Sequence, residues 1–174
     1  MQSTFKNERS TKQVKQLLWF FMIMLLLSGL TAIPLEWGLS IATRFLSDTF
    51  AGPWLEEVYT AIKTTGKAYP FLFYGYDWLA FAHIILALLF IGPIKDPVRN
   101  KWVVEFGIYA CLLIIPFALA AGHFRGIPFW WRLIDCSFGI IGLFPLITAM
   151  RKIIVMEHEE EEQHKHQQQY EFNY

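Results

Sequence analysis

Charged residues are scarce in this chain. They make up 17% of its 174 residues, against about 25% in a typical soluble domain. The shortage is concentrated in long apolar runs, and the formal net charge is zero, so no overall basic field would attract nucleic acid. The composition therefore argues against a nucleic-acid-binding protein and indicates a polytopic membrane protein.

Cysteines and known catalytic motifs are also sparse. The two cysteines, Cys111 and Cys136, lie inside apolar runs and form neither a disulfide framework nor a CxxC metal motif. The sequence contains no P-loop, GxSxG, HExxH or EF-hand pattern, which argues against nucleotide hydrolysis, serine-hydrolase and zinc-protease chemistry. We therefore predict no metal site and no enzyme of these classes.

Four apolar runs are long enough to cross a bilayer. A hydrocarbon core of about 30 Å needs about 20 helical residues. The predicted spans are residues 17–34, 77–94, 102–123 and 132–150. The first run also resembles a signal peptide, but its length and the lack of an A-x-A-like cleavage site favour a retained helix. We therefore predict an all-α fold, with a four-transmembrane-helix bundle in residues 16–152.

The basic residues predict the orientation of the chain. Residues 1–15 carry four Lys or Arg, residues 95–101 carry three, and residues 151–152 carry two. Cytoplasmic segments are enriched in Lys and Arg, so both termini are expected in the cytoplasm, with the compact loops suggesting a bacterial inner membrane. Residues 1–15 would form a basic arm, and residues 153–174 an acidic, polar and disordered tail.

The loop between the first two spans, residues 35–76, is expected on the outer side. Residues 39–50 and 54–63 have apolar side chains at helical spacing, and Gly52-Pro53 separates them. Both segments are too short and too charged to span a bilayer. We therefore predict one or two amphipathic helices that lie at the membrane interface.

Five ionisable residues cluster near the predicted outer ends of the spans. They are Asp77, His123, Arg125, Arg132 and Asp135. A charge in hydrocarbon costs about 3 kcal/mol, so these groups are expected to face one another. One interpretation is a ligand pocket in which the arginines bind an anionic head group or carboxylate, with His123 or Asp135 moving a proton. The other is a structural network of Arg–Asp pairs.

Three further residues within the spans suggest redox or proton chemistry. His83 could bind haem b, or it could be a buried, hydrogen-bonded histidine. It lies six residues beyond Asp77, about 9 Å deeper, which argues against His123 as a second axial ligand of the same iron. Glu105 and Tyr109 could form the inner end of a proton route, or Glu105 could pair with Lys101 one turn earlier.

Each span also carries one face of small or polar residues, which we expect to pack inward. In the third span the predicted face is Glu105, Tyr109, Leu112, Pro116, Leu119 and His123. In the fourth span it is Arg132, Asp135, Gly139, Gly142, Leu146 and Ala149.

The leading hypothesis is a non-enzymatic integral membrane protein. It would act as an accessory or assembly subunit, or bind a small amphiphile at a polar pocket on its outer face. Two alternatives stay open: a haem- or quinone-binding redox subunit, and a small proton-coupled carrier. The expected partners are the lipid bilayer and another membrane protein or a second copy of the chain, with no nucleic acid.

Overall fold

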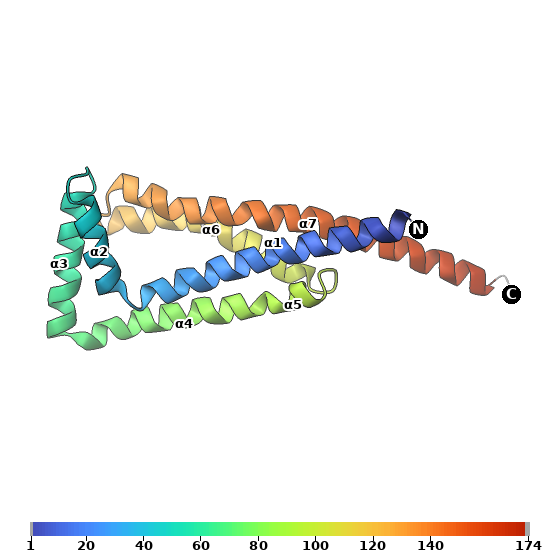
Figure 1. The fold of residues 1–174 in the computed structure, drawn as a ribbon, viewed down its shortest axis with the longest axis horizontal. Helices are drawn as coiled ribbons and strands as arrows, with labels where there is room; N and C mark the ends of the chain where they lie inside the picture. Colours follow the sequence, from blue (N-terminus) through green and yellow to red (C-terminus); the bar gives the residue numbers. More distant parts are fainter. Residues whose placement is uncertain (1, 173–174) are drawn as a thin grey trace. The chain divides into compact units, whose positions relative to one another are not determined.

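The computed structural model describes residues 2–172, and the side chains of residues 10–169, as an all-helical protein (Figure 1). The predicted all-α class is confirmed. The elements are α1 (Gln2–Ala32), α2 (Leu35–Leu46), α3 (Gly52–Ala68), the 3-10 helix η1 (Pro70–Phe73), α4 (Tyr74–Leu89), α5 (Ile91–Lys95), α6 (Lys101–Phe124) and α7 (Phe129–Phe172).

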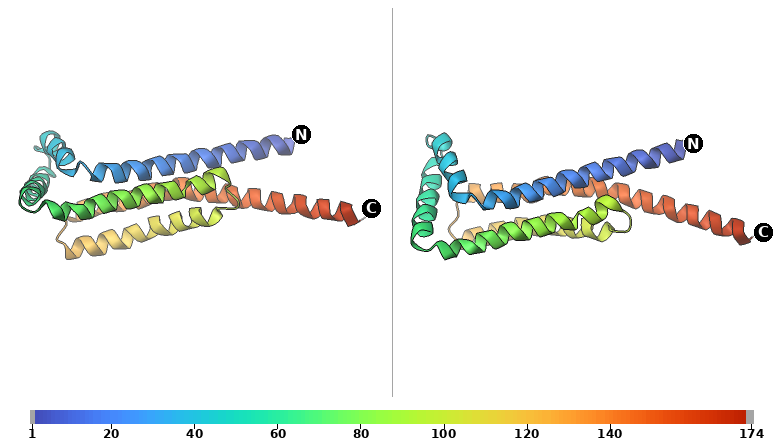
Figure 2. Two further views of the ribbon diagram at one scale, coloured as in Figure 1. Left: turned by 90° about the horizontal axis from the view of Figure 1, so that it is seen from below. Right: turned by 60° about the horizontal axis from the view of Figure 1, so that its bottom comes forward.

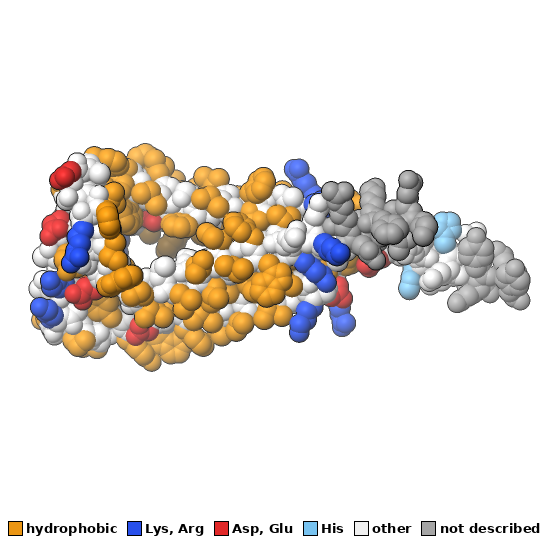
Figure 3. Space-filling view, viewed as in Figure 1, with side chains coloured by type: hydrophobic (Ala, Val, Ile, Leu, Met, Phe, Trp, Pro, Cys, Tyr) orange, Lys and Arg blue, Asp and Glu red, His pale blue; other side chains and the backbone are white. Residues whose placement is uncertain are grey.

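Within the described residues, four helical segments are long and apolar enough to cross a membrane, as predicted. They are Ser10–Ala32, Pro70–Lys95, Lys101–Phe124 and Phe129–Gln169. Many of their large apolar side chains are exposed, and hydrophobic side chains cover much of these helices in the space-filling view (Figure 3). So large an exposed apolar surface is unusual for a soluble monomer and suits contact with lipid.

The helices extend further than the predicted spans at both ends of the chain. α1 already begins at Gln2, so residues 2–15 continue the helix of the first span instead of forming a separate arm. α7 runs through Phe172, where we expected a disordered tail after residue 152. The tail contains no Gly or Pro and is rich in Glu and Gln, which are strong helix formers. The predicted tail's last two residues, 173–174, lie outside the described residues.

The chain divides into two compact units. The larger unit comprises residues 1–22 and 89–174, and the smaller comprises residues 23–88. Each is described by itself below.

In the larger unit, α6 and α7 lie side by side as a helical hairpin (Figures 1 and 2). Only residues 125–128 separate them, so the connection is shorter than residues 124–131, which the predicted third and fourth spans leave between them. Gly126 has a φ of 68°, a conformation that glycine adopts without steric cost. The Ile127 N–H donates to the Gly122 carbonyl at 2.8 Å and the Gly126 N–H to the His123 carbonyl at 3.2 Å, which is a Schellman ending for α6.

Glycine allows α6 and α7 to approach closely. A Cβ added at Gly139 would lie 2.5 Å from the Cys111 carbonyl oxygen, and one at Gly142 would lie 2.8 Å from the Cys111 Sγ. Leu146 and Ala149 on the same side of α7 are fully buried. The predicted inward face of α7 is therefore confirmed.

The predicted inward face of α6 is wrong. Glu105 and Tyr109 are exposed, whereas Val104, Gly107 and Cys111 are buried. The buried side of α6 is instead its small, apolar side. A Cβ added at Gly107 would lie 2.9 Å from the Phe90 ring and 3.0 Å from a Leu146 methyl group, so the absence of a side chain there lets both residues approach closely. Close approach gives more dispersion contacts than a face carrying Glu and Tyr would allow.

Polar contacts join the helices near the α5–α6 turn of the larger unit. Lys101 Nζ lies 2.7 Å from Glu157 Oε2, which links α6 to α7. Lys152 Nζ donates to Gln13 Oε1 at 2.7 Å, which links α7 to α1. Lys and Arg side chains gather at this turn (Figure 3), while the opposite end of the α6–α7 hairpin carries Arg125 and Arg132.

In the smaller unit, α1 and α4 meet at another glycine. Gly29 is buried, and a Cβ there would lie 2.5 Å from the His83 Cβ and 3.0 Å from the Ala80 carbonyl oxygen. The predicted outer loop folds into α2, α3 and η1, and α3 runs crosswise to α4 (Figures 1 and 2). Leu39 of α2 and Leu55 of α3 are buried, so each of these short helices has one packed side.

Candidate functional site

The five residues of the predicted outer cluster are divided between the two units. Asp77 is exposed in the first turn of α4, in the smaller unit. His123, Arg125, Arg132 and Asp135 belong to the larger unit, at the end of the α6–α7 hairpin that contains Gly126. His123 and Arg125 are exposed, and the His123 ring meets the Phe124 ring edge-on at 5.8 Å between centroids.

Arg132 is held by contacts within this hairpin. Its aliphatic stem occupies the space that a side chain at Gly122 would need. Its Nη1 donates to the Leu119 carbonyl at 3.3 Å, and its guanidinium carbon lies 5.2 Å from the centroid of the Phe129 ring. Arg132 therefore joins the last turns of α6 to the first turn of α7.

The second interpretation of this cluster was a network of Arg–Asp pairs, in which Arg132 or Arg125 would pair with Asp135 and Asp77, and Arg132 forms no ion pair with Asp135 in the structure. Among the side chains that the structure describes, the single ion pair is Lys101–Glu157. The Arg132 Nε is buried without a hydrogen-bond partner, and Asp135 is half-buried one turn further along α7. A buried guanidinium N–H without an acceptor is destabilising. The stabilising contribution of Arg132 at the α6–α7 connection therefore comes from the packing of its stem and from one hydrogen bond to a carbonyl.

His83 is half-buried and hydrogen-bonded within its own helix. Its Nδ1 lies 2.8 Å from the Leu79 carbonyl oxygen, and because a carbonyl only accepts, Nδ1 must carry the proton. The hydrogen bond therefore stays within α4 and does not join His83 to another helix. Within the described residues, no hydrogen bond involves Nε2, which keeps its lone pair.

The proposed proton route is not assembled by α6. Glu105 and Tyr109 are both exposed, on the side of α6 away from Gly107 and Cys111. Lys101, which we considered as the partner of Glu105, instead contacts Glu157. In the described part of the chain, no group of three or more His, Cys, Asp or Glu is arranged to hold a metal ion.

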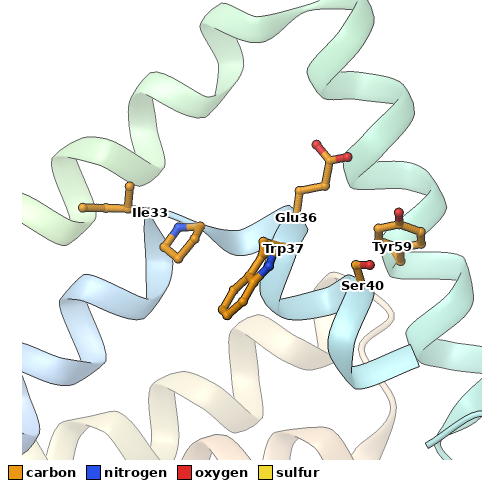
Figure 4. Close-up of a pocket in the computed structure, with 6 residues that line it drawn as sticks. Ile33, Glu36, Trp37, Ser40 and Tyr59 are labelled. Atoms are coloured by element: carbon orange, nitrogen blue, oxygen red, sulfur yellow. The ribbon is translucent and has the colours of Figure 1, made fainter. Parts of the chain in front are cut away.

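A cavity lies at the outer-loop helices of the smaller unit, which no sequence pattern had indicated. It has a volume of about 420 Å³ and opens to the surface. Its lining residues, which we call the α2–α3 groove, are Ile33, Pro34, Glu36, Trp37, Ser40 and Tyr59. Glu36 and Ser40 point from α2 toward α3, where Tyr59 lies, and the Trp37 ring points away from them (Figure 4).

The polar groups of the α2–α3 groove are largely available to a ligand. Lys63 Nζ donates to the Tyr59 hydroxyl oxygen at 3.3 Å, so the Tyr59 hydroxyl proton remains available. The same Lys63 ammonium lies 5.2 Å from the centroid of the Tyr59 ring. Glu36 forms no ion pair with any side chain that the structure describes. The groove thus combines one carboxylate and two hydroxyls with an indole that is 68% exposed.

Comparison of the chain with protein-family models, with curated proteins and with solved structures finds no match.

Proposed function

We propose that the chain is an integral membrane protein that crosses the bilayer four times, with its helices forming a bundle. Four sufficiently long and apolar helices support this. The gathering of Lys and Arg around the α5–α6 turn supports a cytoplasmic position for that end of the α6–α7 hairpin and for both termini. The compact loops agree with the inner membrane of a bacterium.

On this orientation α2 and α3 lie at the outer membrane interface. Trp37 is 68% exposed and Phe45 is 81% exposed on α2, with Arg44 beside them. Exposed aromatic residues next to a cation are typical of helices that rest in the head-group region. The α2–α3 groove would then open where lipid head groups and other amphiphiles are concentrated.

The function that we propose is non-enzymatic binding of a small amphiphile in the α2–α3 groove. The observation that carries this proposal is the make-up of the groove: Glu36, Ser40 and Tyr59 can contact a polar group, while Ile33, Pro34 and Trp37 can contact an apolar one. Its volume of about 420 Å³ lies within the range of small-molecule pockets, about 300–1,000 Å³. The protein would use this site by itself or as an accessory or assembly subunit of a membrane partner.

Native mass spectrometry of the detergent-purified protein tests the proposal. Ser40→Trp places a large side chain in the groove, and Thr60→Trp is a matched control because Thr60 is exposed on α3 and does not line the groove. We expect a bound amphiphile in the wild type and in Thr60→Trp, and its loss in Ser40→Trp. Equal occupancy in the two variants, or no bound molecule in the wild type, would refute the proposal.

A redox subunit is the second candidate, and His83 is the observation in its favour. Its Nδ1–H bond to the Leu79 carbonyl fixes the tautomer and orients the ring, as second-shell carbonyls do for metal-binding histidines. Against it, Gly29 brings α1 close to the His83 Cβ, which leaves little room for haem on that side. A Soret band in the purified protein that disappears in His83→Ala would establish this function instead. The third alternative, a proton-coupled carrier, gains no such support.

A further inference from the structure

We propose that the α2–α3 groove recognises an organic ammonium group, either on a soluble small molecule or on a lipid head group. This rests on the proposed function, since it names the chemistry of the ligand that the same groove binds.

The charge of the groove favours a cation. Glu36 is the one lining residue with a carboxylate, and the lining contains no basic side chain. Glu36 has no ion-pair partner among the described side chains, and it points from α2 to the side on which α3 lies (Figure 4). An ammonium group that enters the groove can therefore form an electrostatic pair with the Glu36 carboxylate without displacing another cation from it.

The Tyr59 ring adds to the attraction of a cation. The π face of a Tyr ring attracts an ammonium group, and the Tyr59 ring already attracts the Lys63 ammonium, 5.2 Å from its centroid. Trp37 is exposed and its ring points away from Glu36 (Figure 4), so it can contact an apolar part of the ligand that extends beyond the ammonium group.

The two hydroxyl groups of the groove can bind the oxygen atoms that often lie near an ammonium group in a ligand. The Tyr59 hydroxyl accepts from Lys63, and its own proton can be donated to an ester, hydroxyl or phosphate oxygen. The Ser40 hydroxyl can do the same. The volume of the groove, about 420 Å³, accommodates a head group rather than a complete two-chain lipid.

Lys63 acts against an ammonium ligand. It lies one helical turn from Tyr59 and does not line the groove, but its positive charge repels a second cation and competes for the Tyr59 ring. This predicts opposite effects for two substitutions: Glu36→Gln should weaken binding, and Lys63→Met should strengthen it. An anionic ligand would show the reverse pattern.

The test is isothermal titration of the full chain in detergent with phosphocholine and with tetramethylammonium. We expect Glu36→Gln to weaken binding about fivefold, the effect of one partly exposed ion pair, and Lys63→Met to strengthen it. Glu57→Gln is the control, because Glu57 is an exposed carboxylate on α3 outside the groove, and it should leave the affinity unchanged.

A second arm identifies the source of the ammonium. The protein is reconstituted in nanodiscs of anionic phosphatidylglycerol with or without phosphatidylcholine, and retained lipid is identified by mass spectrometry. Binding of the free probes supports a soluble ligand, and Glu36-dependent retention of phosphatidylcholine alone supports a lipid head group.

Two results would overturn the inference. One is that neither form of ammonium binds; the other is that Glu36→Gln and Glu57→Gln behave alike. If an amphiphile is still displaced by Ser40→Trp in either case, the ammonium chemistry fails while amphiphile binding stands. If Ser40→Trp also has no effect, both proposals fail.

Discussion

Replacing Gly139 by alanine tests the close packing of α6 against α7. The added Cβ would lie 2.5 Å from the Cys111 carbonyl oxygen and 3.5 Å from the Ile114 Cβ. Ordinary contact begins near 3.4 Å, so the two helices must separate locally by roughly 0.9 Å, which gives up dispersion contacts along the interface. A carbonyl of the helix backbone cannot rotate out of the way as a flexible side chain could.

The expected loss of stability is moderate. Overpacking of this kind costs about 1–3 kcal/mol, and the higher helix propensity of alanine returns up to about 1 kcal/mol. We therefore expect Gly139→Ala to lower the free energy of unfolding by about 1–2 kcal/mol.

Unfolding by SDS titration in mixed micelles, followed by circular dichroism, measures this change. Gly75→Ala is the matched control: Gly75 is also helical, and a Cβ there would meet no atom within 4 Å, so the substitution should be neutral or stabilising. The reasoning is refuted if Gly139→Ala is as stable as Gly75→Ala, because α6 and α7 would then not be in contact at Cys111.

Three further substitutions test other contacts. Arg132→Met keeps an aliphatic stem and removes the buried Nε that has no partner, so its thermal unfolding temperature should equal or exceed that of the wild type, whereas Arg132→Ala should lower it. Lys101→Glu and Glu157→Lys should each destabilise the protein and the double exchange should restore part of the loss, as a double-mutant cycle would show. Gly29→Ala should lower the unfolding temperature by pushing α1 from α4, while Gly38→Ala, which meets no atom within 4 Å, should not.

The long apolar helices were predictable because bilayer thickness sets a minimum length of apolar helix. The packing side of α7 was also predictable, since Gly139 and Gly142 lie on one side of a helix. The packing side of α6 was not. The sequence rule that charged groups avoid lipid favoured the side with Glu105, whereas the smaller Gly107 and Cys111 allow closer helix contact.

The groove was not predictable, because it depends on how α2 is placed against α3. In the sequence Glu36 only follows an apolar run and Tyr59 only belongs to the amphipathic segment 54–63, so neither indicates a cavity. The exposed aromatic Trp37 next to Glu36 was the available signal. The helical tail has a related explanation. A segment rich in Glu and Gln is compatible with disorder because it is hydrophilic and with helix because of its helix propensity, and composition does not separate the two.

The placement of α2 on the outer side and of both termini in the cytoplasm is the claim on which the proposed function depends most. In a variant without native thiols (Cys111→Ala, Cys136→Ala), single cysteines can be placed by Gly38→Cys in α2, Arg99→Cys in the α5–α6 turn and Gln168→Cys near the C-terminus. All three positions are exposed.

A membrane-impermeant maleimide applied to intact bacterial cells then reports the side of each position. The account predicts labelling of Gly38→Cys in intact cells, and labelling of Arg99→Cys and Gln168→Cys only after the membrane is permeabilised. Labelling of either of the last two in intact cells, or protection of Gly38→Cys, would contradict it.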